Sequence, residues 1–243
     1  MDAAATKAMT VNEMAKDGSM RKPGRATVAL LTDRPQTLSE EIANAVSHGI
    51  GFLLAVASLP ILVMFSAREG HPVDVISTSV FSVTMMLLYL VSTLYHAVPS
   101  GRFKHWLNRM DHAAIFLFIA GSYTPFVLGV LHGTWGWTLF GVVWGIALVG
   151  MTLKLLNRLS HPLLSTGLYV GMGWVAIFAA GPLVQRMPVA GMAWLVAGGV
   201  AYTIGAVVFI FDSRFRFAHF AWHLFVLAGS TCHFFAALLY AHP

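Results

Sequence analysis

The stretch VISTSVFSVTMMLLYLVSTLYHAV, residues 75–98, decides the fold class of this chain. It holds 24 residues without an Asp, Glu, Lys or Arg, and about 20 apolar residues are enough for a helix to cross a bilayer. Six further apolar runs accompany it, at 46–66, 112–131, 137–153, 163–183, 190–211 and 218–240. The sequence therefore predicts an all-α integral membrane protein, a bundle of seven transmembrane helices.

The composition agrees with that of an integral membrane protein. Of 243 residues, 57% are hydrophobic and only 10% are charged, against about 25% charged in ordinary soluble domains. The single cysteine, Cys232, excludes an internal disulfide and a thiolate metal cluster. Residues 1–45 are polar and lack a signal-peptide pattern, so we expect a short cytoplasmic tail followed by one transmembrane domain, 46–240. The short run at 137–153 leaves open a six-helix count with one buried re-entrant segment.

Basic residues between the runs predict the orientation, because Lys and Arg are enriched on the cytoplasmic side of short loops. Thirteen of the 15 Lys and Arg residues lie in the tail or in the second, fourth and sixth connections, which share one side of the predicted bundle. The other side holds Arg68 and Arg186. We therefore expect the amino terminus in the cytoplasm and the carboxyl terminus outside. The basic pI near 9.6 reflects this distribution, and no basic stripe suggests binding to nucleic acid.

Five polar residues stand near the predicted cytoplasmic ends of three runs: Ser92, His96, Asp111, His219 and His223. Ionisable groups near hydrocarbon usually persist only when they are paired, bound to an ion or lining a wet cavity. The second run ends at the cytoplasmic side and the third and seventh begin there, so all five lie at a similar depth. His219 and His223 are four residues apart, which places both rings on one helical face. We expect this pair and His96 to converge on one metal ion.

Three nitrogen ligands and a water form the coordination of a catalytic zinc site, so Zn²⁺ is the expected cofactor. Ser92 lies four residues before His96 and faces the same way, so its hydroxyl can hydrogen-bond the bound water or an incoming carbonyl. Asp111 can take the proton of that water or orient it. Zinc lowers the pKa of bound water towards ~7, which gives a hydroxide able to attack an ester or an amide. Iron and manganese would also accept such ligands.

Plainer interpretations of the same residues stay open at this point. Eleven histidines make one pair at a spacing of four unremarkable, and a single His at a helix end is more often interfacial than a ligand. Glu41, Asn44 and His48 share one helical face, which suits an interfacial helix start or a polar lining beneath the site; we favour the structural role. His233 lies ~15 Å deeper than His223 at 1.5 Å per residue, so we do not expect it among the ligands.

In combination these residues resemble the hemolysin III family, the bacterial branch of the progestin and adipoQ receptors, which includes the adiponectin receptors. The resemblance runs from about residue 38 to the end, in Glu41-x-x-Asn44-x-x-x-His48-Gly49, Ser92-x-x-x-His96, Asp111-His112, Ala120-Gly121-Ser122-Tyr123-Thr124-Pro125-Phe126, and His219-x-x-x-His223 with His233-Phe234. It implies a seven-helix bundle with zinc held near the cytoplasmic face by His96, His219 and His223. It also implies that Asp111 and Ser92 lie beside the zinc-bound water. The short tail differs from the long cytoplasmic domains of the receptors, so their hormone binding is not transferred.

The resemblance implies two hypotheses for function. The receptors are associated with ceramidase-like lipid hydrolysis, which suggests a zinc-dependent hydrolase of a lipid amide or ester, with a lipid or fatty acid bound in the bundle. The bacterial members are linked to lipid and fluidity homeostasis, which suggests a non-enzymatic sensor or receptor-like protein with structural zinc. In that case the basic tail would contact anionic lipids or a protein partner. In either case we expect a multi-pass protein of the bacterial inner membrane.

Two other classes of protein fit less well. A secreted haemolysin or pore former would need a secretion signal, and residues 1–45 do not show one. A proton-coupled transporter would need ionisable residues along a path across the membrane. The ionisable groups cluster instead at one face, and no charged residue continues the path across the second, third or seventh run.

Overall fold

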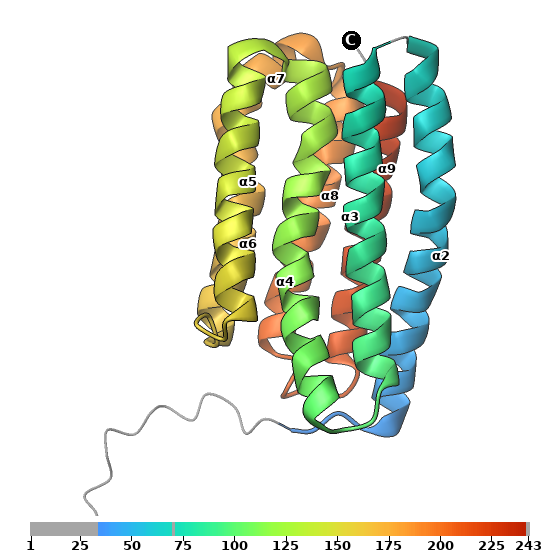
Figure 1. Cartoon of the computed structure of the whole chain (residues 1–243), viewed down its shortest axis with the longest axis vertical. Helices are drawn as coiled ribbons and strands as arrows, with labels where there is room; N and C mark the ends of the chain where they lie inside the picture. The colour runs from blue at the N-terminus through green and yellow to red at the C-terminus, as the bar shows by residue number, and fades with distance from the viewer. Residues whose placement is uncertain (1–33, 70, 242–243) are drawn as a thin grey trace, which may run out of the picture. The chain divides into compact units, whose positions relative to one another are not determined.

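The computed structural model describes residues 34–69 and 71–241, so most of the expected tail, residues 1–33, lies outside the described residues. Within the described ranges the chain is helical without strands, and seven helical segments are long and apolar enough to cross a membrane (Figure 1). These segments are α2 (Leu38–Glu69), α3 (Pro72–Ala97), α4 (Arg102–Thr124) with η1 (Pro125–Leu131), α5 (Gly133–Leu155), α6 (Pro162–Gly173) with η2 (Trp174–Ala179) and α7 (Ala180–Arg186), α8 (Val189–Ile210) and α9 (Ala218–Tyr240). The predicted all-α fold with seven spanning helices is confirmed.

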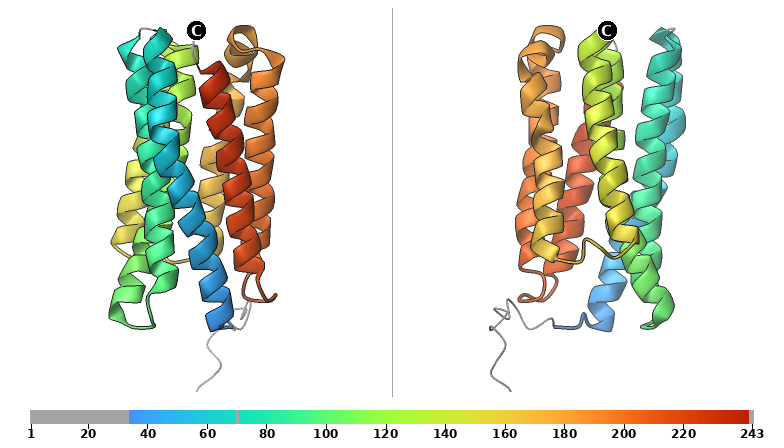
Figure 2. Two further views of the ribbon diagram at one scale, coloured as in Figure 1. Left: turned by 90° about the vertical axis from the view of Figure 1, so that its right-hand side faces the viewer. Right: turned by 60° about the vertical axis from the view of Figure 1, so that its left-hand side comes forward.

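The helices form a closed bundle. Neighbours in the chain pack together, α2 on α3, α3 on α4, α4 on α5, and α8 on α9. In addition, α9 packs against α2 and α6 contacts both α4 and α8, so the first and last helices lie side by side (Figure 2). The span formed by α4 and η1 is the most enclosed of the seven, because 72% of its apolar 18-residue stretch is buried inside the protein. Side chains of α4 therefore face the interior from several directions.

Two helices begin well before their apolar runs. The helix α2 begins at Leu38, and its first turn carries Glu40 and Glu41, where the positive end of the helix dipole favours carboxylates. The helix α4 begins at Arg102, so Asp111 lies in its third turn. Hydrophobicity marks the part of a helix that lies in hydrocarbon, whereas these first turns extend beyond it. Both extensions lie at the same end of the bundle, at the bottom of Figure 1.

Two irregular segments shape the interior. Pro125 has no N–H to donate, and the seven buried residues that begin with it form a π-helix at the end of α4. In the fifth spanning segment, α6 passes into the 3₁₀ segment η2. There the hydroxyl of Tyr123 accepts a hydrogen bond from the Ala176 N–H at 2.9 Å and donates to the Met172 carbonyl oxygen at 3.0 Å. These bonds tie the broken helix to α4 beside the cavity described below.

Candidate metal centre

Two helices bring the three predicted histidine ligands together. His96 lies in the last turn of α3, and His219 and His223 occupy the first two turns of α9. One ligand nitrogen of each ring lies within 4.8 Å of the other two. Nitrogens on one tetrahedral zinc, about 2.0–2.1 Å from the ion, lie roughly 3.4 Å apart. Small inward movements of these side chains therefore suffice for one ion to contact all three.

Carboxylates hold two of these rings. His96 Nδ1 lies 2.7 Å from Glu41 Oε2, and His219 Nδ1 lies 3.0 Å from Asp212 Oδ2. A metal-binding histidine generally donates its second ring N–H to a carboxylate or carbonyl, which fixes the tautomer and the direction of the ring. Both contacts have this form, because each occupies Nδ1 and leaves Nε2 as the atom that can bind an ion.

The third ring, His223, is held by the backbone of α2. Its Nδ1 lies 3.2 Å from the Asn44 carbonyl oxygen and 3.1 Å from Ser47 Oγ. His223 is only 1% exposed, so its Nε2 is also directed into the protein. The Nε2 of His96 is buried without a hydrogen-bond partner among the described residues. A buried nitrogen left without a partner is costly, and an ion at this point would satisfy it.

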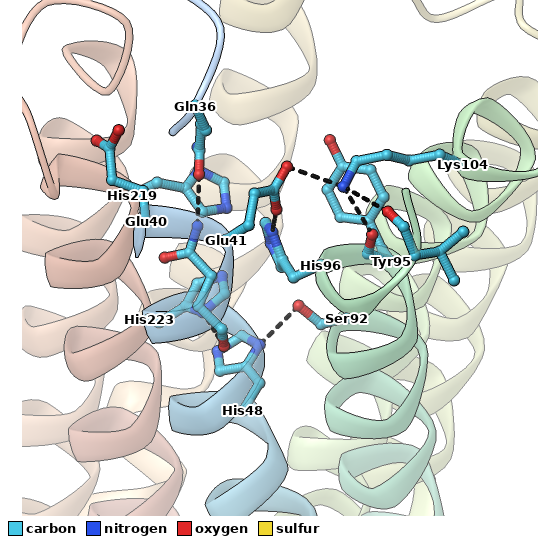
Figure 3. A network of polar contacts seen from close by, with 12 residues as sticks. Gln36, Glu40, Glu41, His48, Ser92, Tyr95, His96, Lys104, His219 and His223 are labelled. Atoms are coloured by element: carbon cyan, nitrogen blue, oxygen red, sulfur yellow. Dashed lines mark hydrogen bonds and ion pairs between the residues drawn. The ribbon is translucent and has the colours of Figure 1, made fainter. Parts of the chain in front are cut away.

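Lys104 extends the polar network to a fourth helix, α4 (Figure 3). Its Nζ lies 2.8 Å from Glu41 Oε1 and donates to the carbonyl oxygens of Tyr95 and Val98, each at 3.1 Å. Glu41 thus receives a ring nitrogen from α3 on one oxygen and an ammonium from α4 on the other. The carboxylate is fixed from both sides, and the starts of α2 and α4 are tied to the end of α3.

A fourth histidine, His48, lies directly against the cluster. Its ring stacks on that of His223, with centroids 3.5 Å apart and planes inclined by 8°. His48 Nδ1 lies 2.7 Å from Ser92 Oγ, and its Nε2 is buried without a hydrogen-bond partner in the described part of the chain. The predicted residue Ser92 therefore faces the histidines and hydrogen-bonds the ring of His48. Of the two roles open for Glu41, Asn44 and His48, the polar lining of the site agrees better with the structure.

Asp111 reaches the same region from α4. It is 8% exposed and lines a cavity together with His48, Ser92 and His223. The structure thus brings together all five predicted residues at one end of the bundle, three as a possible ligand set and two on the adjoining cavity wall. His233 lies outside the ligand set and lines the cavity further along.

The start of α9 is anchored to α2. Phe217, which precedes α9, has a left-handed backbone with φ of 61°, a strained conformation for a residue other than glycine. Its N–H donates to Glu40 Oε1 at 2.8 Å, and its carbonyl oxygen accepts the Ala221 N–H at 2.9 Å. These bonds stabilise the strained residue and set where His219 enters the site.

The cavity beside Asp111 is mostly apolar and runs into the bundle away from the histidines. Its deeper wall is formed by residues of α4, α6, η2, α8 and α9, among them Phe118, Tyr123, Val170, Trp174, Tyr202 and His233. A second cavity continues from it, shares Tyr123, Trp174 and His233, and ends among Leu131, Leu183 and Met192. The site therefore opens on its inner side towards a long apolar space within the bundle.

Comparison with known proteins identifies the family. The family model described as "Haemolysin-III related" matches residues 36–234, which include all five predicted site residues. The chain belongs to this family. It is 45% identical over 204 residues to the "Hemolysin-3 homolog" of Bacillus subtilis (strain 168), covering 84% of this chain and 95% of the relative. It is 40% identical over 213 residues to "Hemolysin-3" of Bacillus cereus, covering 88% and 97%.

A more distant relative is human "Monocyte to macrophage differentiation factor", 27% identical over 216 residues, with 85% of this chain and 86% of the relative covered. No solved structure matches the chain. The predicted family is confirmed by these similarities, which extend over nearly the whole described bundle. They also support a multi-pass integral membrane protein.

The sequence interpretation missed two residues that hold the site. Asp212 stands in the connection between α8 and α9, where the chain is not a regular helix, so its distance of seven residues from His219 in the sequence does not tell which way its side chain faces. Lys104 looked like one of several basic residues that set the orientation. The signal for Glu41 was present, because it shares a helical face with Asn44 and His48, but the contact with His96 depends on how α2 and α3 pack.

Proposed function

We propose that this chain is a zinc-dependent membrane hydrolase that cleaves the amide or ester bond of a lipid. The observation that carries the proposal is the orientation of three histidines, each with Nδ1 bound to an oxygen and Nε2 left for an ion. His96, His219 and His223 would hold Zn²⁺, which supplies a Lewis acid and a water of lowered pKa when bound.

The side chains around the histidines have separate roles in this proposal. Asp111 accepts a proton from the attacking water, or orients that water, because it is the carboxylate on the cavity wall next to the histidines. Ser92 donates its hydroxyl to the carbonyl oxygen of the substrate and is itself oriented by His48 at 2.7 Å. Glu41 and Asp212 are positioning residues that hold the rings of His96 and His219.

The cavity supports a lipid as the substrate. An acyl chain in the apolar space would place its carbonyl carbon at the polar end, between Asp111 and Ser92. The burial of methylene groups contributes about 0.8 kcal/mol each, so a long chain supplies ample binding energy. We further propose that the site lies at the cytoplasmic face of the bacterial inner membrane, because the basic connections lie at this end.

The test uses purified, zinc-loaded protein and two substrates, an N-acyl amide lipid and a monoacyl ester, with release of fatty acid measured by mass spectrometry. Replacement of Asp111 by Asn should lower turnover about 10²- to 10⁴-fold and leave one zinc bound per chain. A matched control is Thr231→Val on the exposed side of α9, which should retain full turnover. Normal turnover in the Asp111→Asn protein would exclude this mechanism.

A membrane sensor with structural zinc is the second candidate function. The contacts that link several helices at the site favour it. Glu41 of α2 contacts His96 of α3 and Lys104 of α4, so bound zinc would also set how four helices meet. This function predicts no fatty acid release from any lipid and a changed acyl composition in cells that lack the protein. Unchanged lipids in such cells would count against it.

A further inference from the structure

One polar side chain inside the bundle has no role in the proposed reaction. His233 lies on α9, ten residues beyond His223, which corresponds to about 15 Å along a helix. It lines both the cavity that begins at the histidine cluster and the cavity that continues it. An imidazole at this depth in a membrane protein usually has a functional contact, because burial of a polar group in hydrocarbon is costly.

The packing of α8 against α9 fixes the orientation of this ring. Gly198 leaves room on α8 for the ring of His233, and Gly229 leaves room on α9 for the ring of Tyr202. A side chain at either glycine would overlap the opposite ring. The two rings lie 5.3 Å apart between their centroids, so each blocks rotation of the other. His233 is therefore held in one position on the cavity wall.

The hydrogen bond of His233 also fixes its tautomer. Nδ1 lies 2.9 Å from the carbonyl oxygen of Gly229. A carbonyl oxygen only accepts, so Nδ1 carries the proton and Nε2 of the neutral ring is an acceptor. Among the described residues the hydrogen bond of this ring is made by Nδ1, and none is made by Nε2. A group that binds there must donate a hydrogen bond.

Other polar groups at this depth are already engaged. The hydroxyl of Thr203 donates to the Gly199 carbonyl oxygen at 2.7 Å and accepts from Trp174 Nε1 at 3.1 Å. Tyr202 shares a hydrogen bond with Ser230 at 3.2 Å. The hydroxyl of Ser122, which also lines both cavities, donates to the Ile119 carbonyl oxygen at 2.8 Å. Along this stretch of the cavity, Nε2 of His233 is thus a side-chain acceptor without a hydrogen bond among the described residues.

We propose that His233 forms a second polar subsite, which accepts a hydrogen bond from a hydroxyl group in the middle of a lipid acyl chain. An extended chain advances roughly 1.3 Å per carbon, the projection of a C–C bond of about 1.5 Å, so 15 Å corresponds to about ten to twelve carbons. The ligand class is accordingly a long-chain lipid hydroxylated about ten to twelve carbons from its carbonyl group. The inference relies on the part of the proposed function that places an acyl chain in the cavity, and not on hydrolysis.

The experiment measures binding of free fatty acids to the full-length protein in detergent by competition with a fluorescent fatty acid. Stearate, 12-hydroxystearate and 2-hydroxystearate are compared, so that chain length is constant and only the hydroxyl position changes. We expect 12-hydroxystearate to bind roughly three- to tenfold more tightly than stearate, as one net hydrogen bond allows. The 2-hydroxy acid should show no such preference, because its hydroxyl is far from His233.

Two variants separate the hydrogen bond from packing. His233→Phe keeps an aromatic ring against Gly198 and removes the acceptor, so it should bind stearate within about twofold of the original protein and lose the preference for 12-hydroxystearate. Thr231→Val, on the exposed side of the same helix, should keep the preference. Thermal unfolding of both variants checks that each is folded.

The outcomes distinguish this inference from the proposed function. If all three acids bind equally to the original protein, or if His233→Phe keeps the preference, the subsite is wrong while the hydrolase proposal stands. If no fatty acid binds, the cavity does not hold an acyl chain and both fail. If the fatty acids bind with the expected preference but the protein hydrolyses no lipid, the subsite is supported and the proposed hydrolase function is excluded.

Discussion

The two ends of α3 carry polar residues that are bonded in different ways. Near its start, the hydroxyl of Ser77 donates to the Asp74 carbonyl oxygen of the same helix at 3.0 Å. Thr78 donates to the same oxygen at 2.8 Å and also lies 3.0 Å from the hydroxyl of Ser66 on α2. The hydroxyl of Ser79 donates to the Val75 carbonyl oxygen at 2.6 Å. Such bonds within one helix remove the cost of a hydroxyl in an apolar environment and need no neighbour.

At the other end of α3, polar side chains find their partners on other helices. Ser92 contacts His48, and His96 contacts Glu41, both on α2 and both at 2.7 Å. In addition, a nitrogen of His96 and one of His48 remain buried without partners in the described part of the chain. Polarity alone therefore does not mark a site in a membrane bundle. A site is indicated instead by contacts between helices in which an atom that can bind a ligand remains without a partner.

The largest effect should come from removal of a ligand. His223→Ala should reduce bound zinc from one ion per chain to less than about 0.1, because the two imidazoles that remain, His96 and His219 with centroids 5.0 Å apart, do not complete a zinc site. Elemental analysis of protein purified without chelators measures this. The control is Ser79→Ala, near the opposite end of α3, which should retain the ion. Equal zinc content in both variants would remove the distinction between the two ends.

A smaller effect is expected from the carboxylate that holds His96. Glu41→Gln keeps the size of the side chain but weakens the bond to Nδ1, and loss of such a partner typically costs 10- to 100-fold in metal affinity. Competition with a coloured chelator gives the dissociation constant. Glu40→Gln, one residue earlier, should change it far less, because the amide oxygen of Gln can still accept the Phe217 N–H that positions the start of α9. Similar losses in both variants would mean that net charge, and not the contact, matters.

Lys104 should have a still smaller effect, because its side-chain contact with the site is the ion pair with Glu41, and its other bonds are to the backbone carbonyl oxygens of Tyr95 and Val98. We expect Lys104→Met to weaken zinc binding a few-fold, in the range of a partly exposed ion pair. Lys104→Arg should restore most of the affinity, since its guanidinium can also bind the carboxylate. The double variant with Glu41→Gln should be no weaker than Glu41→Gln alone. An additive loss would show that Lys104 acts on the site by another route.

The smallest effect belongs to the opposite end of α3. Ser79→Ala removes a hydroxyl bonded to its own helix, and the free energy of unfolding should change by no more than about 0.5 kcal/mol. Thermal unfolding of the purified protein measures this. Tyr89→Phe is the matched contrast, because the hydroxyl of Tyr89 donates to Ser230 of α9 at 2.7 Å. Loss of this hydroxyl should lower the free energy of unfolding by about 0.5–1.5 kcal/mol. Equal costs would contradict the difference between bonds within and between helices.

Hydrophobic runs were sufficient to predict the number and order of the spanning helices. They could not give the helix ends, because the first turns of α2 and α4 carry charged residues that continue the helix beyond the apolar run. Orientation was predicted from the basic connections and stays a prediction.

The site was only partly predictable. Depth and the spacing of four brought His219 and His223 into one group with His96, since these follow from helix geometry. Asp212 could not be found this way, because it lies in a connection whose path is set by packing. The stacking of His48 on His223 likewise depends on the distance between α2 and α9.

X-ray absorption at the zinc edge, on protein loaded with one equivalent of zinc, tests the central claim most directly. The account predicts a four-coordinate ion with three imidazole nitrogens at about 2.0–2.1 Å and one further light ligand. His219→Ala should lose one imidazole from this shell or lose the ion. A spectrum with oxygen ligands only, or one that His219→Ala leaves unchanged, would show that the three histidines do not share an ion.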